Sequence, residues 1–254
     1  MLTRDYILSG EFHRAHELTL PGHMIWDREK ITESMLTTLK ERPSGAPVWI
    51  FAYGSLMWNP LLAVEEMRKA TLSGWQRRFC IRLISGRAVP EKPGRMLSLD
   101  KNGDAVGIAF RLSDSGLEKE LLLVWIREMI TGLYQPCWLQ VVLDSGEQVD
   151  AITFVSDRHH SLYISNSSVE DVSPAILQAH GTIGSNADYV YQLEQTLDSW
   201  NILDSYVSDV SKSLRAITQS WDGSYQKGDI RGKFEGIQRC RESLGRNLPA
   251  ALRI

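Results

Sequence analysis

The chain has 254 residues, of which 43% are hydrophobic and 23% charged, so it can bury one sizeable core, and its length does not demand two domains. The formal net charge of −3 predicts neither nucleic-acid binding nor attraction to an anionic membrane. No segment approaches the roughly 20 apolar residues that span a bilayer, and charges interrupt the N-terminal apolar stretches, unlike a signal peptide. Three widely separated cysteines fit reduced thiols. We therefore expect a cytoplasmic protein without a nucleic-acid or membrane partner.

The N-terminal part of the chain is predicted to be a helical extension, residues 1–45. Asp27 can cap a short helix that runs to about Leu39. Residues 41–46, which contain Pro43 and Gly45, form a linker into the first strand.

A buried apolar strand then ends at a turn of small residues. Gly54 has no Cβ, so a ligand can approach the main chain there, and Ser55 adds a hydroxyl donor. Successive N–H groups in such a turn can bind a carboxylate or phosphate. A plain turn is the alternative interpretation. The residues that we expect to form the binding segment are Ile50, Phe51, Ala52, Tyr53, Gly54, Ser55 and Leu56.

Strand patterns occur on both sides of one long helical pattern. Before it, strands are predicted at 69–75, 77–84, 95–99 and 105–112. After it, residues 137–143 and 149–155 form a pair that is joined by a turn at 144–146. Because the strands do not alternate regularly with helices, the sequence predicts an α+β fold: a small mixed or antiparallel β-barrel with flanking helices.

Residues 113–134 are predicted to form that helix, with capping-box spacing between Ser115 and Glu118 and a stop at Gly132. Glu128 falls in the middle of an apolar arc that contains Leu117, Leu121, Val124 and Trp125. Burial raises the pKa of a carboxyl group, which suits proton transfer near neutrality. The alternative is a Glu128 that is satisfied by an arginine or backbone amides and only fixes packing.

The last third of the chain is predicted to be helical. Ser173-Pro174 is a typical helix start, and Ser185 with Asp188 is another. Residues 219–254 form a C-terminal tail of unknown role. The six histidines are dispersed and no Cys/Asp pair has ligand spacing, so we expect no metal site.

Three ordered elements resemble the ChaC family of γ-glutamylcyclotransferases, enzymes that cleave glutathione. The family's Gly-Tyr-Gly-Ser-Leu core corresponds to residues 52–56, with Ala52 in place of the usual glycine. The other matching positions are Arg127-Glu128 with Gly132-Leu133-Tyr134, the late element Gly181, Gly184, Asn186 and Tyr189, and the shorter segments Arg77-Arg78-Phe79 and Pro93-Gly94-Arg95. The similarity covers about 46–218, which we take as a catalytic domain with the family's β-barrel fold.

The resemblance implies a cyclisation in which glutathione supplies its own nucleophile. Its α-amine attacks the δ-carbonyl, 5-oxoproline forms and cysteinylglycine leaves, with Glu128 as general base and acid. The amides of residues 53–56 would hold the γ-glutamyl group or the developing oxyanion. Tyr134 is either a packed aromatic or a phenol that faces the pocket. For Asn186 we favour a cap or turn role over that of a substrate ligand. Four residues are candidates for binding the glycyl carboxylate of glutathione, and the sequence does not rank them: Arg82, Arg87, Lys92 and Arg95.

Because the nucleophile is internal, we expect no cofactor and no metal. Glutathione is the expected small-molecule partner, and the sequence indicates no oligomeric state. Two other functions stay open. The protein could be a cyclotransferase for other γ-glutamyl amines or amino acids, or a non-enzymatic regulator linked to cation transport.

Overall fold

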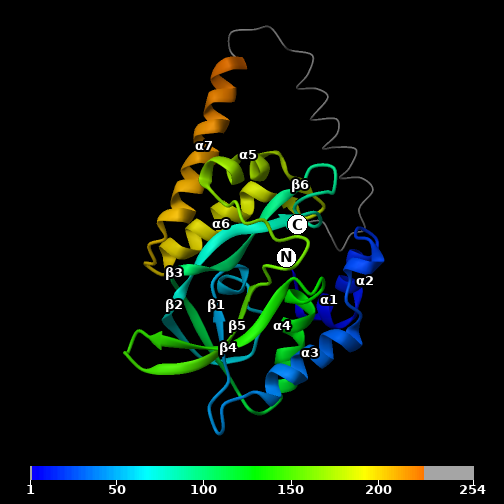
Figure 1. Cartoon of the computed structure of the whole chain (residues 1–254), viewed down its shortest axis with the longest axis vertical. Helices are drawn as coiled ribbons and strands as arrows, with labels where there is room; N and C mark the ends of the chain where they lie inside the picture. The colour runs from blue at the N-terminus through cyan, green and yellow to red at the C-terminus, as the bar shows by residue number, and fades with distance from the viewer. Residues whose placement is uncertain (1, 226–254) are drawn as a thin grey trace. The chain divides into compact units, whose positions relative to one another are not determined.

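The computed structural model describes residues 2–225 and is built on a closed β-barrel (Figure 1). The strand order around the barrel is β1-β3-β2-β4-β5, with bounds β1 Trp49–Ala52, β2 Val64–Leu83, β3 Gly94–Leu112, β4 Tyr134–Leu143 and β5 Gln148–Ser156. β1 pairs antiparallel with β3 and parallel with β5, which closes the barrel. The prediction of an α+β fold with a mixed barrel is confirmed.

Helices flank this barrel on both sides (Figure 1). α3 packs against α4 and contacts β4, whereas α5 contacts β3 and α6. The helix bounds are α1 Arg4–Leu8, α2 Glu11–Glu17, α3 Arg28–Lys40, α4 Leu117–Glu128, α5 Val169–Gln178, α6 Asn186–Ser199 and α7 Ser205–Tyr225. Short 3-10 turns lie at η1 Gly22–Met24 and η2 Ser55–Met57, and a two-stranded ribbon joins β6 His180–Gly181 to β7 Gly184–Ser185.

Residues 2–213 form one compact unit, and the described residues from Leu214 to Tyr225 belong to another. The barrel and the elements before α7 belong to the first unit, and α7 begins there. Residues 219–225 of the predicted tail continue α7, and residues 226–254 lie outside the described part of the chain.

The four strands predicted before α4 are in fact two long ones. β2 and β3 pair antiparallel from Leu83↔Gly94 to Val64↔Leu112, with register shifts that include one between Ser73 and Trp75. Such shifts are β-bulges, which take up an extra residue without ending the strand. The polar and glycine positions that predicted strand ends therefore lie inside continuous strands.

The core joins the helices to the barrel through aromatic side chains. All four residues of β1 are buried, as is the predicted apolar arc of α4, Leu117, Leu121, Val124 and Trp125. The Trp125 ring meets Phe154 of β5 edge to face at 4.8 Å. Truncating such a buried aromatic costs about 3–5 kcal/mol. Trp138 of β4 donates from its indole to the Thr38 carbonyl at 2.8 Å, which attaches α3 to the barrel.

The central helix is shorter than predicted at both ends. α4 begins at Leu117 after Gly116, which has φ +77, and the Ser115–Glu118 capping box is absent. The Ser113 hydroxyl instead accepts from the Ser115 amide at 3.3 Å. α4 ends at Glu128, because the chain must turn through residues 129–133 before β4 begins.

Side-chain caps mark the first residues of α3, α5 and α6. Asp27 caps α3 through the Lys30 amide, and Ser185 and Asp188 form the predicted capping box of α6. The prediction of a helix start at Ser173-Pro174 is wrong, because Ser168 caps α5 five residues earlier. Pro174 lies inside α5, where its missing N–H removes one backbone hydrogen bond.

Gly132 provides a test of how the N-terminal extension packs on the turn after α4. It has φ +62, and a Cβ at this position would overlap the indole of Trp26. We expect Gly132→Ala to lower the free energy of unfolding by about 2–4 kcal/mol, the sum of left-handed strain and overpacking. Gly146 has φ +90 and nothing within 4 Å of an added Cβ, so Gly146→Ala should show the strain alone. Equal losses in urea denaturation would contradict the Trp26 contact.

Candidate active site

The predicted binding segment divides into strand and turn. Ile50, Phe51 and Ala52 lie in β1 and are buried in the barrel. Tyr53 and Gly54 follow, and Ser55 and Leu56 begin η2. The turn is closed by the Met57 amide, which donates to the Gly54 carbonyl at 2.9 Å, and by the Asn59 amide, which donates to the Ser55 carbonyl at 3.1 Å.

A buried arginine on β2 supports the turn from inside. Arg77 is 1% exposed and donates from Nε to the Tyr53 carbonyl at 2.7 Å. It also donates to the Val106 carbonyl at 2.6 Å and pairs with Asp204 at 3.0 Å. Burial lowers the pKa of Arg77, and Asp204 opposes that shift. Arg77 had no predicted role, although an arginine in an apolar strand pattern was the signal for it.

Glu128 is the last residue of α4, and Arg127 connects it to the turn. Arg127 Nε lies 3.1 Å from Glu128 Oε1, while Nη2 donates to Ser55 Oγ at 2.7 Å. Nη1 donates to the Asn59 carbonyl. The side chains of Arg127 and Glu128 are only 8% and 17% exposed. Both predicted segments, although far apart in sequence, are thus joined by one guanidinium group.

The Glu128 side chain is largely buried, with only 17% of it exposed. Burial raises the pKa of its carboxyl group, and the neighbouring Arg127 lowers it only in part. The arginine partner of the alternative interpretation is therefore present, since Arg127 pairs with Glu128, but the pKa of Glu128 stays raised. A carboxylate of this kind can exchange a proton nearer neutrality than an exposed glutamate can.

Three tyrosines, the buried Tyr53 and Tyr189 and the half-buried Tyr134, are close enough to Glu128 for its charge to affect their pKa values. Tyr53 donates to the Phe154 carbonyl at 2.6 Å, and Tyr134 to the Leu97 carbonyl at 3.2 Å. Burial raises the pKa of both phenols and of Tyr189, and the Glu128 charge raises all three further. They are therefore neutral hydrogen-bond donors at physiological pH. Tyr189 was matched to the late family element, but it had no predicted role.

Gly54 is close to a protein side chain. A Cβ at Gly54 would lie 2.9 Å from the Tyr189 hydroxyl and 3.4 Å from Leu97 Cδ2. The Ser55 amide hydrogen-bonds to the Tyr189 hydroxyl and partly opposes the effect of burial on the pKa of that phenol. The absence of a side chain at Gly54 thus admits Tyr189 to the turn.

The late element joins α6 to the start of β3. Asn186 is fully buried, and its Oδ1 accepts from the Arg95 amide at 2.7 Å. Its Nδ2 and Arg95 Nη1 are buried without a hydrogen-bond partner among the described residues. The other three cations differ: Arg87 donates to the Ser185 carbonyl at 3.0 Å, and Arg82 and Lys92 are exposed.

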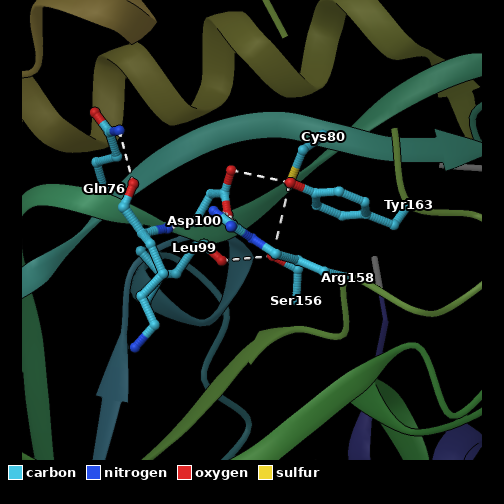
Figure 2. A network of polar contacts seen from close by, with 8 residues as sticks. Gln76, Cys80, Leu99, Asp100, Ser156, Arg158 and Tyr163 are labelled. Carbon is cyan, nitrogen blue, oxygen red and sulfur yellow. Dashed lines mark hydrogen bonds and ion pairs between the residues drawn. The ribbon is translucent and has the colours of Figure 1, made fainter. Parts of the chain in front are cut away.

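A second polar network fastens the loop after β5 to β3 (Figure 2). Asp100 accepts from Arg158 Nε at 2.8 Å and from the Tyr163 hydroxyl at 3.1 Å. Ser156 Oγ donates to the Leu99 carbonyl at 2.6 Å and lies 3.8 Å from Cys80 Sγ. Burial raises the pKa of the Cys80 thiol to about 11, so this cysteine is a structural thiol.

The described residues contain neither a metal-binding cluster nor a membrane-spanning helix. Within residues 2–225, no group of three or more His, Cys, Asp and Glu side chains could hold a metal ion. None of the helices in the same range is long and apolar enough to cross a membrane.

Comparison with known proteins gives the family. Residues 48–217 match the model of the ChaC-like protein family. The glutathione-specific γ-glutamylcyclotransferase of Escherichia coli (strain K12) is 42% identical over 217 residues, which cover 85% of this chain and 94% of that protein. Human glutathione-specific γ-glutamylcyclotransferase 1 is 29% identical over 158 residues, 60% of this chain and 71% of that protein.

A crystal structure of the yeast γ-glutamyl cyclotransferase specific to glutathione has the same fold. It superposes with a TM-score of 0.60 at 17% identity, covering 68% of this chain and 99% of that one. The barrel with its flanking helices is the γ-glutamylcyclotransferase fold. The chain belongs to the ChaC-like family.

The raised pKa of Glu128 predicts a pH-dependent effect of Glu128→Gln on stability. Between the unfolded and the higher folded pKa, the folded state binds more protons, so stability falls as pH rises through that interval. Glutamine does not titrate. The free energy of unfolding of Glu128→Gln, relative to that of wild type, should therefore increase as pH rises from about 4 toward 7. The increase should be about 1.4 kcal/mol for each unit by which the folded pKa of Glu128 exceeds its unfolded pKa.

Glu147 offers the matched control, because it is exposed in the turn between β4 and β5. Urea denaturation of Glu147→Gln across the same pH range should show no such trend. A difference for Glu128→Gln that is flat with pH would mean that the carboxyl group has an ordinary pKa in the folded protein.

Proposed function

We propose that this protein degrades glutathione to 5-oxoproline and cysteinylglycine, as a γ-glutamylcyclotransferase. The observation that carries the proposal is the buried Glu128, whose raised pKa is combined with a direct connection through Arg127 to the Ser55 turn. Membership of the ChaC-like family and 42% identity to the E. coli glutathione-specific enzyme support the same function.

The reaction needs positioning and proton transfer. The α-amine of the γ-glutamyl group loses a proton and attacks the δ-carbonyl, which forms the ring C–N bond. The second proton leaves the ring nitrogen as the amide C–N bond breaks, and the departing cysteinyl nitrogen gains one. Holding the chain folded accounts for much of the acceleration, because effective molarities of aligned groups are very large.

Glu128 is our candidate for both proton transfers. Its carboxylate can accept from the amine and return a proton to the leaving nitrogen, since burial brings its pKa closer to neutrality. Arg127 fixes the carboxylate from one side through the 3.1 Å contact. Because that contact is made by Oε1, we assign the exchange of the proton with the substrate to Oε2.

The turn is our candidate for holding the γ-glutamyl moiety. The amides of residues 53–56 can bind its carboxylate or the developing oxyanion, and Ile50, Phe51 and Ala52 form the buried strand behind them. Tyr134 adds a neutral phenol, which could exchange its 3.2 Å hydrogen bond to the Leu97 carbonyl for one to the substrate. A neutral donor of this kind can hydrogen-bond a substrate oxygen.

Arg95 is our candidate for the glycyl carboxylate of glutathione. Arg95 is half-buried, with Nη1 unpartnered among the described residues. It is the second residue of β3, the strand whose Leu97 side chain approaches Gly54. Arg87 already donates to Ser185, and Arg82 and Lys92 are exposed. We also infer a cytoplasmic location, which the free thiols Cys80 and Cys137 support.

The general acid/base role predicts the effect of Glu128→Gln on turnover. Glutamine keeps the shape of the side chain but cannot exchange a proton, so kcat for 5-oxoproline formation should fall by at least about 100-fold. Glu147→Gln should retain full activity. Detection of 5-oxoproline and cysteinylglycine from glutathione is the assay. Activity of Glu128→Gln within a few-fold of wild type would remove Glu128 from the catalytic role.

The carboxylate contact predicts a substrate-dependent effect of Arg95→Gln. For glutathione, KM should rise about 10- to 100-fold, the range for loss of a hydrogen bond to a charged group. For glutathione with its glycyl carboxylate converted to an amide, KM should change little. Lys92→Gln removes the same charge from the neighbouring loop and should leave both KM values unchanged. An equal effect of Arg95→Gln on both substrates would assign the carboxylate to another residue.

A further inference from the structure

The N-terminal segment, residues 2–27, contacts the chain on both sides of Arg127 and Glu128, which we call the catalytic pair. It precedes the residues that match the family model, which begin at 48. One set of contacts is to the loop 58–63 that follows the turn, and the other is to residues 129–133 that follow Glu128. The segment thus contacts both elements whose meeting forms the site.

Arg4 makes the first connection. Its two terminal nitrogens donate to the two oxygens of Glu120 on α4, each at 2.7 Å, and Nη1 also donates to the Leu61 carbonyl at 2.7 Å. Glu120 Oε2 accepts from the Ala63 amide at 2.8 Å. Leu61 has φ +58, a backbone conformation that is unfavourable for leucine and persists where contacts enforce it. Arg4 therefore fastens the loop to the helix that carries Glu128.

Asn59 makes the second connection, and this one leads to the catalytic pair. Its side chain donates from Nδ2 to the Leu2 carbonyl at 3.2 Å. Its own carbonyl accepts from Arg127 Nη1. The Arg127 guanidinium that faces Glu128 is thus held by a backbone group whose residue is attached to the N-terminus.

Trp26 makes the third connection, on the far side of Glu128. Its amide donates to the Ile130 carbonyl at 2.9 Å, and its indole covers Gly132. Lys30 Nζ lies over the same aromatic side chain, 4.2 Å from the ring centroid. The turn that ends α4 directly after Glu128 is therefore closed by the N-terminal segment.

We propose that Leu2, Arg4 and Trp26 of the N-terminal segment act as a clamp that orients Arg127 and Glu128 for proton transfer, with Arg4 as the principal positioning residue. The inference rests on the proposed function, because it concerns the same carboxylate. Its physical basis is that a reacting group displaced by about 1 Å can lose 100-fold in rate, so contacts remote from the substrate control kcat.

The first test is Arg4→Gln with glutathione as substrate. We expect kcat to fall about tenfold, measured well below the melting temperature, while KM stays within about twofold, because the substrate contacts themselves are intact. Arg4→Lys should recover part of kcat. Arg14→Gln removes the same charge from α2, where the exposed Arg14 side chain has no ion pair with any residue of the described chain, and should retain wild-type kcat.

A double-mutant cycle separates positioning from general destabilisation. If Arg4 acts through Arg127, the effect of Arg4→Gln on kcat should be largely lost in an Arg127→Lys background. Two outcomes would overturn the clamp. One is a wild-type kcat for Arg4→Gln, and the other is an Arg4→Gln effect on kcat that is the same size in the Arg127→Lys background as in wild type. If Arg4→Gln does not fold, Asn59→Ala breaks the connection to Leu2 and is judged by the same two outcomes.

Hydrogen exchange tests the clamp without relying on activity. The amides of residues 127–133 should exchange faster in Arg4→Gln than in Arg14→Gln, and equal rates would overturn the proposal. A wild-type protein that forms no 5-oxoproline would refute the proposed function and leave this measurement to decide the clamp. A wild type that turns over while Arg4→Gln matches it would refute the clamp alone.

Discussion

Arg127 makes three contacts at once: with Glu128, with Ser55 Oγ and with the Asn59 carbonyl. A planar guanidinium suits this arrangement, since its donors diverge in fixed directions and its charge persists at any physiological pH. The contact at Glu128 offsets part of the penalty for burying a carboxylate, and the contacts at Ser55 and Asn59 fix the distance between helix and turn. Both proposed roles of the site, substrate holding and proton transfer, depend on that distance.

The barrel supplies the rigid frame for this contact. β1 delivers the turn from the barrel wall, and Arg77 supports the turn by donating to the Tyr53 carbonyl. α4 is held against β5 by the Trp125–Phe154 contact, so its last residue, Glu128, arrives at a fixed place. Burying the Glu128 carboxylate in this way lowers the stability of the folded protein, a cost that the proposed catalytic role would explain.

Two features of the site could be read from local sequence. The strand that ends at Gly54-Ser55 and the acidic residue within an apolar helix arc both follow from periodicity and residue chemistry, and the structure places them together. The structure also explains why Gly54 lacks a side chain, because the Tyr189 hydroxyl occupies the space beside it. Nothing local in residues 186–189 indicated that contact, since Tyr189 comes to the turn from a helix more than 130 residues later.

The sequence by itself determined the barrel class, the caps of α3 and α6 and an acidic residue within an apolar helix arc, because these depend on local periodicity and side-chain capping. Only the tertiary structure decided where α4 ends, what Arg127 connects to Glu128 and what the N-terminal segment contacts. Those features rest on contacts such as Trp26 with Gly132 and Arg4 with Glu120. The partners in such pairs are far apart in the chain, so neither residue's neighbours in sequence carry information about the other.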